Sequence, residues 1–420
     1  MGKPLPSGAT IAVVGAGIIG ASAAFVLAER GYKVTLIDRA EPGRSGPSFG
    51  NAGHVVGSAI HPLAEPGIAL DGLRMLANPD APLKIPAAYL GRIAPWLWRF
   101  WRSSTGSAYQ QSRTALTALN AGAVDETEAL FARAGMSEKL KRAPALYLYE
   151  SEASWRTSLS GWADRDRAGL VSTQVDAAEI RRLEPDLAPI FIHGMLSQEW
   201  AIVTDPFEIV TRLVAAAQRL GVALERGRVS AIQPTGERVS LGIDSATRTY
   251  DAVLVTAGVW SRDLAKTLEE YLPVEAERGY NVTYSSAPVG IQRPLVLADR
   301  GVVATALSPG LRIGGWTELG GINLPPNPAR WAKMRAISAA ILPGIETAPA
   351  VEWMGHRPSM PDSVPVISRS LRHPAVFYAV GHGHYGLSYA AKTARLVGEL
   401  IGDAADIRLA AHGMIRFNRP

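Results

Sequence analysis

Three glycines near the start of the chain have the spacing of a nucleotide-binding turn. Gly15, Gly17 and Gly20 form G-x-G-x-x-G, and an acid, Asp38, follows 18 residues after the last of them. The first glycine permits a tight turn, the second lets backbone N–H groups approach a pyrophosphate, and the third lets a helix pack close to a strand. The helix N-terminus adds partial positive charge, and the acid is suited to two ribose hydroxyls. We expect a dinucleotide with an unphosphorylated ribose, either FAD or NAD.

The elements needed to hold this turn surround it. Residues 11–14 form an apolar run typical of a buried parallel strand, and residues 21–30 have a helical periodicity that Gly31 ends. The segment KVTLID at 33–38 predicts a second strand with Asp38 at its end. A lone glycine motif also occurs by chance in glycine-rich loops, but here the whole strand–helix–strand unit is present.

The rest of the chain distinguishes FAD from NAD. An NAD enzyme would continue the alternation of strands and helices, whereas residues 44–57 form a Gly/Ser/Asn-rich loop that leads into a long helical stretch. The nucleotide-type pattern resumes at 203–258, where a buried strand at 252–255 precedes Thr256-Ala257-Gly258, and recurs at 374–388. A dinucleotide fold assembled from three separated pieces predicts a flavoprotein with inserted substrate segments.

Composition excludes several classes of protein and site. With 420 residues, 47% of them hydrophobic and 19% charged, the chain is long enough for more than one domain. Its 43 Lys and Arg against 38 Asp and Glu leave a formal charge of only +5, so a nucleic-acid partner is not expected. The absence of cysteine excludes disulfides, thiolate catalysis, cysteine-ligated zinc and a cysteinyl link to a cofactor. No metal site is predicted.

The N-terminal residues give an expectation for localisation. They are polar before the first apolar run and lack the apolar region and cleavage site of a signal peptide. No stretch reaches the ~18 uninterrupted apolar residues of a spanning helix. We therefore expect a soluble, cytoplasmic protein.

A Trp-rich stretch at 89–104 has two interpretations. It mixes three tryptophans with three arginines, a composition found in amphipathic segments at membrane interfaces, here the inner membrane. The other interpretation is an ordinary amphipathic helix that begins at Pro95 and packs Leu97, Trp98 and Trp101 on the substrate domain. The second is favoured because one short segment is thin evidence for a membrane, and peripheral membrane contact stays the alternative.

Four stretches, whose order and spacing cover nearly the whole chain, carry a resemblance to a known family. The chain resembles an FAD-dependent D-amino-acid dehydrogenase of the glycine oxidase/D-amino-acid oxidase superfamily. The stretches are the opening strand–helix–strand unit, SFGNAG at 48–53, LRIGGWTELGG at 311–321, and GHRPSMPDSVPVI at 355–367 with VGHGHYGLSYA at 380–390. The resemblance implies an FAD cofactor and an amino-acid substrate.

The segment GHGHYG at 381–386 is expected beside the flavin ring. A flavin that accepts hydride becomes an anion, and a helix N-terminus offers it N–H groups and the positive end of a dipole. In the resembled family this segment lies beside the isoalloxazine, whereas the histidines at 382 and 384 are expected to be packed or exposed loop residues. The expected cofactor-binding residues are Gly15, Gly17, Ile18, Ile19, Gly20, Asp38, Arg39, Ser48, Asn51, Ala52, Gly53, Val229, Ala257, Gly258, Trp260, Gly355, Gly383, Tyr385, Gly386 and Leu387.

Arg357, Tyr280 and His54 are the candidate catalytic residues. A bidentate guanidinium fixes a planar carboxylate, and Arg357 matches the family's carboxylate-binding arginine. Tyr280 lies on a predicted strand with Arg278 and Val282 on the same face, where the resembled dehydrogenases place a Gly-Tyr pair at the cavity rim. His54 stands where glutamine is common in the family, and it would tune protonation of the substrate amine. The alternatives are a salt-bridging arginine at a domain seam, a core tyrosine and a structural histidine.

The resemblance implies FAD-dependent oxidation of a D-amino acid, with cis-4-hydroxy-D-proline as a plausible proline-like substrate. Hydride would leave Cα for flavin N5 without a dedicated general base, and water would convert the imine to a 2-oxo acid. The electron acceptor would be a quinone or electron-transfer chain, or oxygen. The alternatives are a glycine- or sarcosine-type amine oxidase, and a non-catalytic flavin-binding subunit of an amine dehydrogenase complex. The presence of Arg357 argues against the last of these.

The expected architecture combines α/β and α+β character in two interleaved domains. One is a discontinuous Rossmann-like FAD-binding domain, and the other is a substrate domain built on an antiparallel sheet with a Pro-rich surface loop at 320–331. The FAD-binding domain takes residues 1–57, 190–272 and 350–420, and the substrate domain takes 58–189 and 273–349.

Overall fold

The computed structural model describes residues 4–68, 72, 81–402 and 412–417, so parts of the expected segments 1–57, 58–189 and 350–420 lie outside the described residues. One sheet within this range has the strand order β10-β2-β1-β14-β21-β20, all parallel except β20. Its strands come from three separated regions of the chain. They are β1 (Thr10–Val14), β2 (Lys33–Asp38), β10 (Ala223–Arg226), β14 (Ala252–Val255), β20 (Val366–Arg369) and β21 (Val376–Val380).

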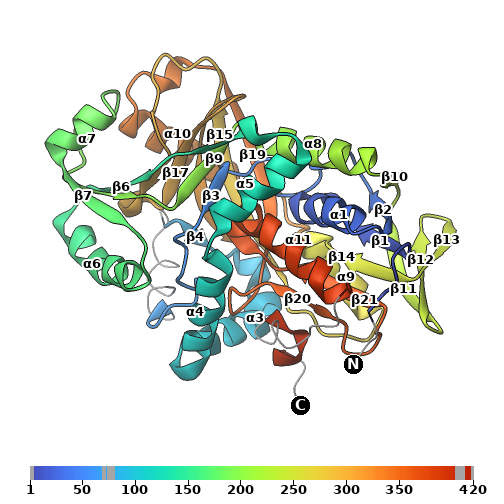
Figure 1. Ribbon diagram of the computed structural model, residues 1–420. Helices are drawn as coiled ribbons and strands as arrows, with labels where there is room; N and C mark the ends of the chain where they lie inside the picture. Colours follow the sequence, from blue (N-terminus) through green and yellow to red (C-terminus); the bar gives the residue numbers. More distant parts are fainter. Residues whose placement is uncertain (1–3, 69–71, 73–80, 403–411, 418–420) are drawn as a thin grey trace.

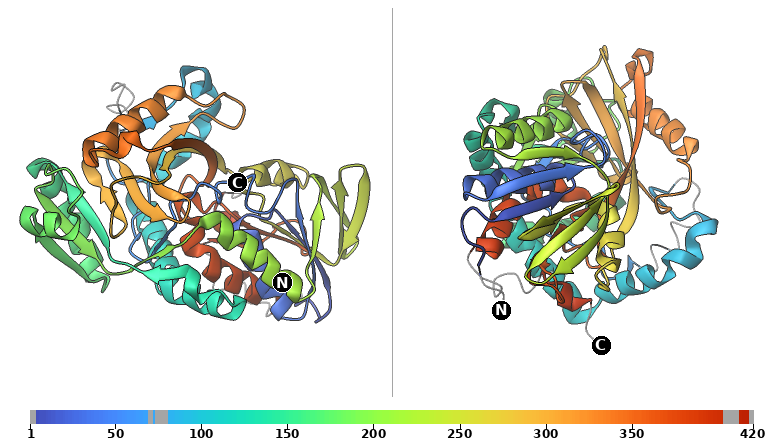
Figure 2. Two further views of the ribbon diagram at one scale, coloured as in Figure 1. Left: turned by 90° about the horizontal axis from the view of Figure 1, so that it is seen from above. Right: turned by 90° about the vertical axis from the view of Figure 1, so that its right-hand side faces the viewer.

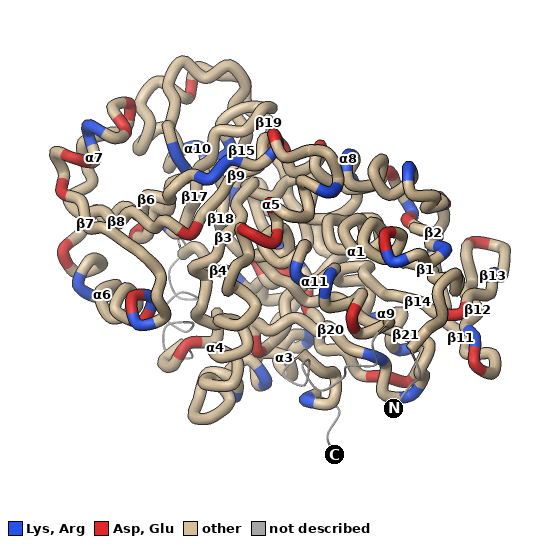
Figure 3. The backbone as a smooth tube through the Cα atoms, viewed as in Figure 1, with Lys and Arg blue, Asp and Glu red and all other residues tan. Residues whose placement is uncertain are grey.

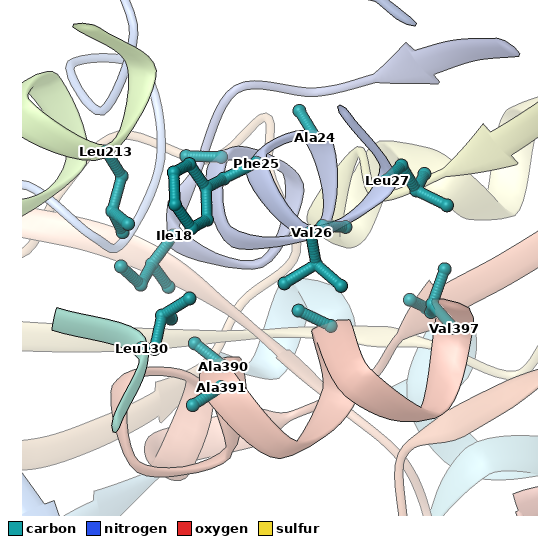
Figure 4. Close-up of a cluster of buried hydrophobic side chains, with 14 of the residues drawn as sticks. Ile18, Ala24, Phe25, Val26, Leu27, Leu130, Leu213, Ala390, Ala391 and Val397 are labelled. Carbon is teal, nitrogen blue, oxygen red and sulfur yellow. The ribbon is translucent and has the colours of Figure 1, made fainter. Parts of the chain in front are cut away.

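Helices cover one face of this sheet. They are α1 (Ile18–Glu29), α5 (Ala123–Ala134), α8 (Pro206–Arg219) and α11 (Gly386–Gly402). Because α1 is apolar on nearly every side, it is buried between the sheet and its neighbours. Figure 4 shows Phe25 and Val26 of α1 between Leu213 of α8 and Ala390 of α11. The first and last segments of the chain therefore lie side by side, as Figure 2 shows.

The other face carries a small antiparallel sheet and a short helix. These elements are β11 (Val229–Thr235), β12 (Arg238–Ile243), β13 (Ala246–Tyr250) and α9 (Ser261–Lys266).

A larger, mostly antiparallel sheet forms the second part of the molecule, with strand order β19-β15-β18-β17-β16-β6-β8-β7 and β4 beside β18. Helix α10 (Pro328–Ile341) packs on β15 and β18, and α6 (Glu152–Arg167) and α7 (Ala177–Leu183) lie near the other end (Figure 1). The strands are β4 (Leu83–Lys84), β6 (Ala145–Tyr149), β7 (Ser172–Asp176), β8 (His193–Ser197), β15 (Glu275–Tyr284), β16 (Leu295–Leu297), β17 (Val302–Leu307), β18 (Gly310–Leu319) and β19 (Ala350–Ser359).

A third sheet of short strands joins the two parts. It comprises β3 (His54–Val56), β9 (Trp200–Val203) and β5 (Leu140–Arg142), with β9 in the centre. Helix α4 (Gly106–Asn120) packs against α11 and also against α3 (Leu90–Ser103), which lies at the lower side of the molecule in Figure 1. Basic and acidic residues are interspersed over both parts (Figure 3).

The predicted fold class is confirmed, but two strands fall on the other side of the expected domain boundaries. Strand β8 and strand β19 belong to the larger sheet, although they lie in segments assigned to the FAD-binding domain. β19 pairs with β15 along its whole length, from Glu275 opposite Ser359 to Tyr284 opposite Ala350. The pairing with β15 places residues 350–359 in the larger sheet, and local sequence patterns do not encode such a pairing. The loop expected at 320–331 ends at 327, where α10 begins, and Gly320 and Gly321 are buried.

The Trp-rich segment forms α3, but not as predicted. The helix begins at Leu90 with Pro95 inside it, and its buried residues are Ile93 and Trp96. Trp98 and Trp101 are 57% and 42% exposed, so the prediction that they pack on the substrate domain was wrong. The helix starts five residues earlier than assumed, and the stripe that faces the protein contains Ile93, Trp96 and Phe100. Among the described residues, no helix is long and apolar enough to cross a membrane.

Candidate active site

A cavity of about 690 Å³ lies between the parallel sheet and the larger antiparallel sheet. Its walls come from the carboxyl ends of β1, β2 and β14, from the start of α1 and α11, and from β15, β17, β18 and β19. Of the predicted site residues, Gly20, Gly53 and Gly355 do not line it. Those that do are Gly15, Gly17, Ile18, Ile19, Asp38, Arg39, Ser48, Asn51, Ala52, His54, Val229, Ala257, Gly258, Trp260, Tyr280, Arg357, Gly383, Tyr385, Gly386 and Leu387.

The glycine turn forms a close-packed cradle at one end of the cavity. Gly15 has a φ of +109°, and a Cβ there would lie 2.7 Å from the carbonyl oxygen of Thr256. A Cβ on Gly20 would lie 1.8 Å from the carbonyl oxygen of Gly15, which matches the packing role predicted for this residue. Gly17 begins α1 without a side-chain cap and lines the cavity, so a side chain there would fill the space that a pyrophosphate requires. The residues present fit a bound dinucleotide.

The nucleoside end of the cradle lies at the end of β2. The Asp38 carboxylate accepts hydrogen bonds from the backbone N–H groups of Ala16 (2.7 Å) and Ala40 (3.0 Å), which hold it at the cavity wall. The guanidinium of Arg39 lies 3.7 Å from the ring centre of Trp260, and burial lowers the pKa of this arginine. Two flat groups therefore stack at the edge of the cavity.

Beyond the cradle, the loop that contains SFGNAG is held against the larger sheet. Arg312 donates to the carbonyl of Asn51 (2.6 Å), and Asn281 donates through Nδ2 to the carbonyl of Gly50 (2.7 Å). Oδ1 of Asn281 is buried and has no hydrogen-bond partner among the described residues. Buried polar atoms are nearly always paired, so a donor on a molecule bound here would complete the arrangement.

The sequence profile of the DAO family, described as FAD dependent oxidoreductase, matches residues 10–400. The chain belongs to this family. FAD is therefore its cofactor, as the sequence predicted, and the DAO-family chain is an oxidoreductase.

Individual relatives agree with the DAO assignment. A D-amino-acid oxidase of Bradyrhizobium diazoefficiens is 32% identical over 421 residues, which cover 98% of this chain and 100% of that protein. Glycine oxidase from Geobacillus kaustophilus has a TM-score of 0.74 at 20% identity, covering 97% of this chain and 98% of that one. L-Proline dehydrogenase from P. horikoshii has a TM-score of 0.75 at 18% identity, covering 99% of both chains. At these identities the two structures show a shared fold.

Arg357 of β19 lines the DAO-family cavity. Its Nη1 is 3.0 Å from Oε1 of Glu277 and also donates to the carbonyl of Gly315 (3.4 Å) and to Thr317 Oγ1 (3.4 Å). Nε and Nη2 have no hydrogen-bond partner among the described residues, and the guanidinium lies over the Cα of Gly279. The edge that binds carboxylates in a bidentate manner is left for a ligand.

Glu277 is a partner of Arg357 that the sequence analysis missed. Its buried carboxylate accepts hydrogen bonds from Thr317 Oγ1 (2.9 Å), Ser359 Oγ (2.8 Å), Arg357 and His384. Burial alone would raise the pKa of Glu277, but His384, Arg357 and the hydrogen bonds hold it well below its ordinary value. The sequence did contain a signal for Glu277, because residues 277, 279 and 281 form the opposite face of the predicted strand that contains Tyr280.

The hydroxyl of Tyr280 is engaged within the larger sheet, which favours the alternative of a core tyrosine over the predicted catalytic role. The phenol donates to Oε1 of Glu318 (3.3 Å), accepts from the backbone N–H of Asn327 (3.0 Å) and packs edge-on against Trp331. Its face of β15 points to α10, as the buried bond of its neighbour Arg278 to Glu318 also shows. The predicted alternation of side chains along β15 was correct, but Glu277 and its partner Arg357 lie on the opposite face from the side chain of Tyr280.

His54 lines the cavity as a neutral imidazole. Its Nε2 is hydrogen-bonded to Thr305 Oγ1, and its ring packs edge-on against Trp200 at 5.0 Å. Burial lowers the pKa of His54 to about 3. Such a weak base suits a hydrogen-bonding role better than uptake of a proton.

The two histidines of GHGHYG differ from one another. His382 is packed, as expected, with Nε2 3.0 Å from Thr393 Oγ1, and burial lowers its pKa to about 3. His384 lines the cavity with Nε2 against Oε1 of Glu277. This contact was not foreseen from the sequence, because it arises only where strand β15 brings a buried carboxylate to the loop.

The remaining substrate walls are mostly apolar and were not predicted. Tyr147, Trp200, Val296 and Val303 line the cavity, and Arg165 of α6 reaches it while donating through Nε to the carbonyl of Ser58 (3.2 Å). These residues come from separate elements that only the strand order brings together, so no local motif marks them.

Proposed function

We propose that this FAD-dependent oxidoreductase oxidises an amino acid, and in particular a D-amino acid. The observation that carries the proposal is the free Nε–Nη2 edge of Arg357 in a cavity with apolar walls. The edge binds the substrate carboxylate, and the walls exclude water and orient the Cα–H bond. The glycine turn, Asp38 and the start of α11 would hold FAD, which would supply the hydride acceptor.

The 32% identical relative is a D-amino-acid oxidase, which favours D-amino acids as substrates. The structural similarity to L-proline dehydrogenase adds proline-like substrates, such as cis-4-hydroxy-D-proline, to the amino acids that should be tested. The likeness to glycine oxidase keeps a glycine- or sarcosine-type amine as the second candidate. Anaerobic bleaching of the flavin absorbance tests both. Bleaching by D-isomers but not L-isomers supports the first proposal, bleaching by glycine or sarcosine alone supports the second, and failure of every amine to bleach a flavin-loaded protein refutes both.

The electron acceptor is a quinone or another component of an electron-transfer chain, or oxygen. After bleaching by a substrate, admission of air separates the two classes. Rapid return of the flavin colour with formation of hydrogen peroxide identifies an oxidase. Slow return in air and rapid return with a soluble quinone identify a dehydrogenase.

We also propose that α3 contacts an anionic membrane surface, so that a cytoplasmic enzyme attaches peripherally to the inner membrane. Trp98 and Trp101 are exposed, and the helix carries three arginines and no acid. Cosedimentation with phosphatidylglycerol vesicles tests this, with phosphatidylcholine vesicles as the control. Binding to the anionic vesicles that is lost in a Trp98→Ser, Trp101→Ser variant supports the contact, and equal recovery in the supernatant with both lipids refutes it.

A further inference from the structure

His384 and Glu277 form a histidine–carboxylate pair beside Arg357, in which the carboxylate is buried and the imidazole is partly exposed to the cavity. We propose that His384, held by Glu277, accepts the ammonium proton of the bound amino acid before hydride leaves Cα. The proposal rests on the proposed function and adds to it a proton acceptor, which the sequence did not predict.

One carboxylate oxygen of Glu277 places the pair beside Arg357. Oε1 of Glu277 contacts both Nη1 of Arg357 and Nε2 of His384, and these two nitrogens are 3.2 Å apart. An amino acid carries its carboxylate and its nitrogen on the same carbon. A substrate held by Arg357 therefore brings its nitrogen close to the residue that shares a partner with that arginine.

The carboxylate decides where the proton lies on the imidazole, because Oε1 of Glu277 is closer to Nε2 than Nη1 of Arg357 is. An ionised carboxylate only accepts hydrogen bonds, so Nε2 of His384 carries the hydrogen that Glu277 receives. In neutral His384 the other nitrogen, Nδ1, then has a free lone pair, and it has no hydrogen-bond partner among the described residues. A carboxylate that fixes the tautomer of a histidine and stabilises its protonated form is the arrangement that produces a general base.

The other titratable groups around His384 are unsuited to the task. Arg357 on β19 and Glu277 on β15 are the charged neighbours, and Tyr385, whose ring centre is 6.2 Å away, has its pKa raised by burial. His54 and His382 also line the cavity, but their pKa values are about 3. Among the described groups beside Arg357, His384 is thus the one with an unengaged nitrogen lone pair.

The proton and electron balance is complete. The N–H bond of the ammonium group breaks and the proton moves to Nδ1 of His384. The Cα–H bond then breaks with its electron pair passing to FAD, the oxidant, and the nitrogen lone pair forms the C=N bond. The substrate loses two electrons, FAD gains them, and the proton leaves His384 for solvent before the next turnover.

The test is His384→Gln, because Gln places an N–H donor where Nε2 stood and keeps the bond to Glu277, but lacks the acceptor at Nδ1. The control is His193→Gln, which alters a histidine–carboxylate pair outside the cavity, 2.8 Å from Glu152. Anaerobic flavin reduction by the best substrate is followed in wild type and both variants from neutral to strongly alkaline pH. Binding of benzoate, a carboxylate without an amine, is followed in parallel by its perturbation of the flavin spectrum.

We expect His384→Gln to lower kcat/KM roughly 10²- to 10³-fold near neutral pH, the range typical of a lost general base. The loss should shrink to within about tenfold at alkaline pH, where the free amino acid is already deprotonated, and benzoate should bind as to wild type. A loss of equal size at every pH, weakened benzoate binding, or no loss at all overturns the proposal. If no amino acid reduces wild type, the proposed function itself fails; if wild type is reduced and the variant keeps its pH profile, only this inference fails.

Discussion

Glu277 and Arg357 are directly paired residues on the neighbouring antiparallel strands β15 and β19. Their side chains meet on the cavity face, where the carboxylate takes Nη1 and leaves Nε and Nη2 unengaged. Two long strands therefore fix the orientation of the guanidinium before any ligand arrives, which reduces the entropy lost on binding.

Replacement of this arginine tests that orientation. Lysine in Arg357→Lys keeps the charge but not the planar fork, so KM for the amino acid should rise and kcat/KM should fall roughly 10²-fold. Steady-state kinetics measure this, with Arg335→Lys as the control because the ion pair of Arg335 with Glu352 lies outside the cavity. An unchanged KM in Arg357→Lys would show that the carboxylate binds elsewhere.

The close packing around Gly20 predicts that a larger residue at this position weakens the binding of FAD. A Cβ in Gly20→Ala would lie 1.8 Å from the carbonyl oxygen of Gly15, and the backbone must shift at a cost of about 1–3 kcal/mol. If this cost falls on the cradle, the affinity for FAD drops roughly 5- to 150-fold, as measured by titration of the apoprotein. In Gly290→Ala, the control, the Cβ has open space within 4 Å. Wild-type affinity in Gly20→Ala would contradict the packing argument.

Tyr280→Phe separates a structural from a catalytic tyrosine. The variant loses the bond to Glu318 and leaves the N–H of Asn327 without its acceptor, so the free energy of unfolding should fall by about 1–3 kcal/mol. Turnover should stay within about twofold, because the hydroxyl faces α10. Urea unfolding and steady-state kinetics measure the two quantities. A turnover reduced more than tenfold at unchanged stability would restore the catalytic role.

Buried His382 makes stability depend on pH. Its pKa is about 3 in the folded protein against about 6.5 in an unfolded chain, so the unfolded state binds a proton first as the pH falls. Stability should therefore decrease from about pH 6.5 down to about pH 3, by up to ~1.4 kcal/mol per pH unit from this residue. His382→Gln, which keeps a donor for Thr393, should flatten the slope of unfolding free energy against pH. An equal slope in the variant would show that His382 does not contribute.

The sequence predicted the nucleotide end of the site better than the substrate end. Gly15, Gly17 and Asp38 lie within one continuous strand–helix–strand unit, so local spacing is sufficient to place them. Glu277 and His384 are 107 residues apart and meet only because β15 lies beside β19 and the start of α11 follows β21. A pairing of that kind depends on strand order, which local periodicity does not encode. The exposed face of α3 was missed for a simpler reason, since apolar residues surround much of this helix and the sequence pattern does not decide which stripe of them packs on the protein.

The position of β1 in its sheet has a consequence for synthesis of the protein. β1 lies between β2 and β14, and β14 in turn lies between β1 and β21, whose residues are among the last fifty of the chain. The nascent chain must emerge almost entirely from the ribosome before the sheet can close, because β1 lacks one neighbour until β14 is made and the apolar edge of β14 then lacks its partner until β21 is made. FAD cannot be fully enclosed by a truncated chain, and chaperones that shield strand edges should bind the nascent chain for most of translation.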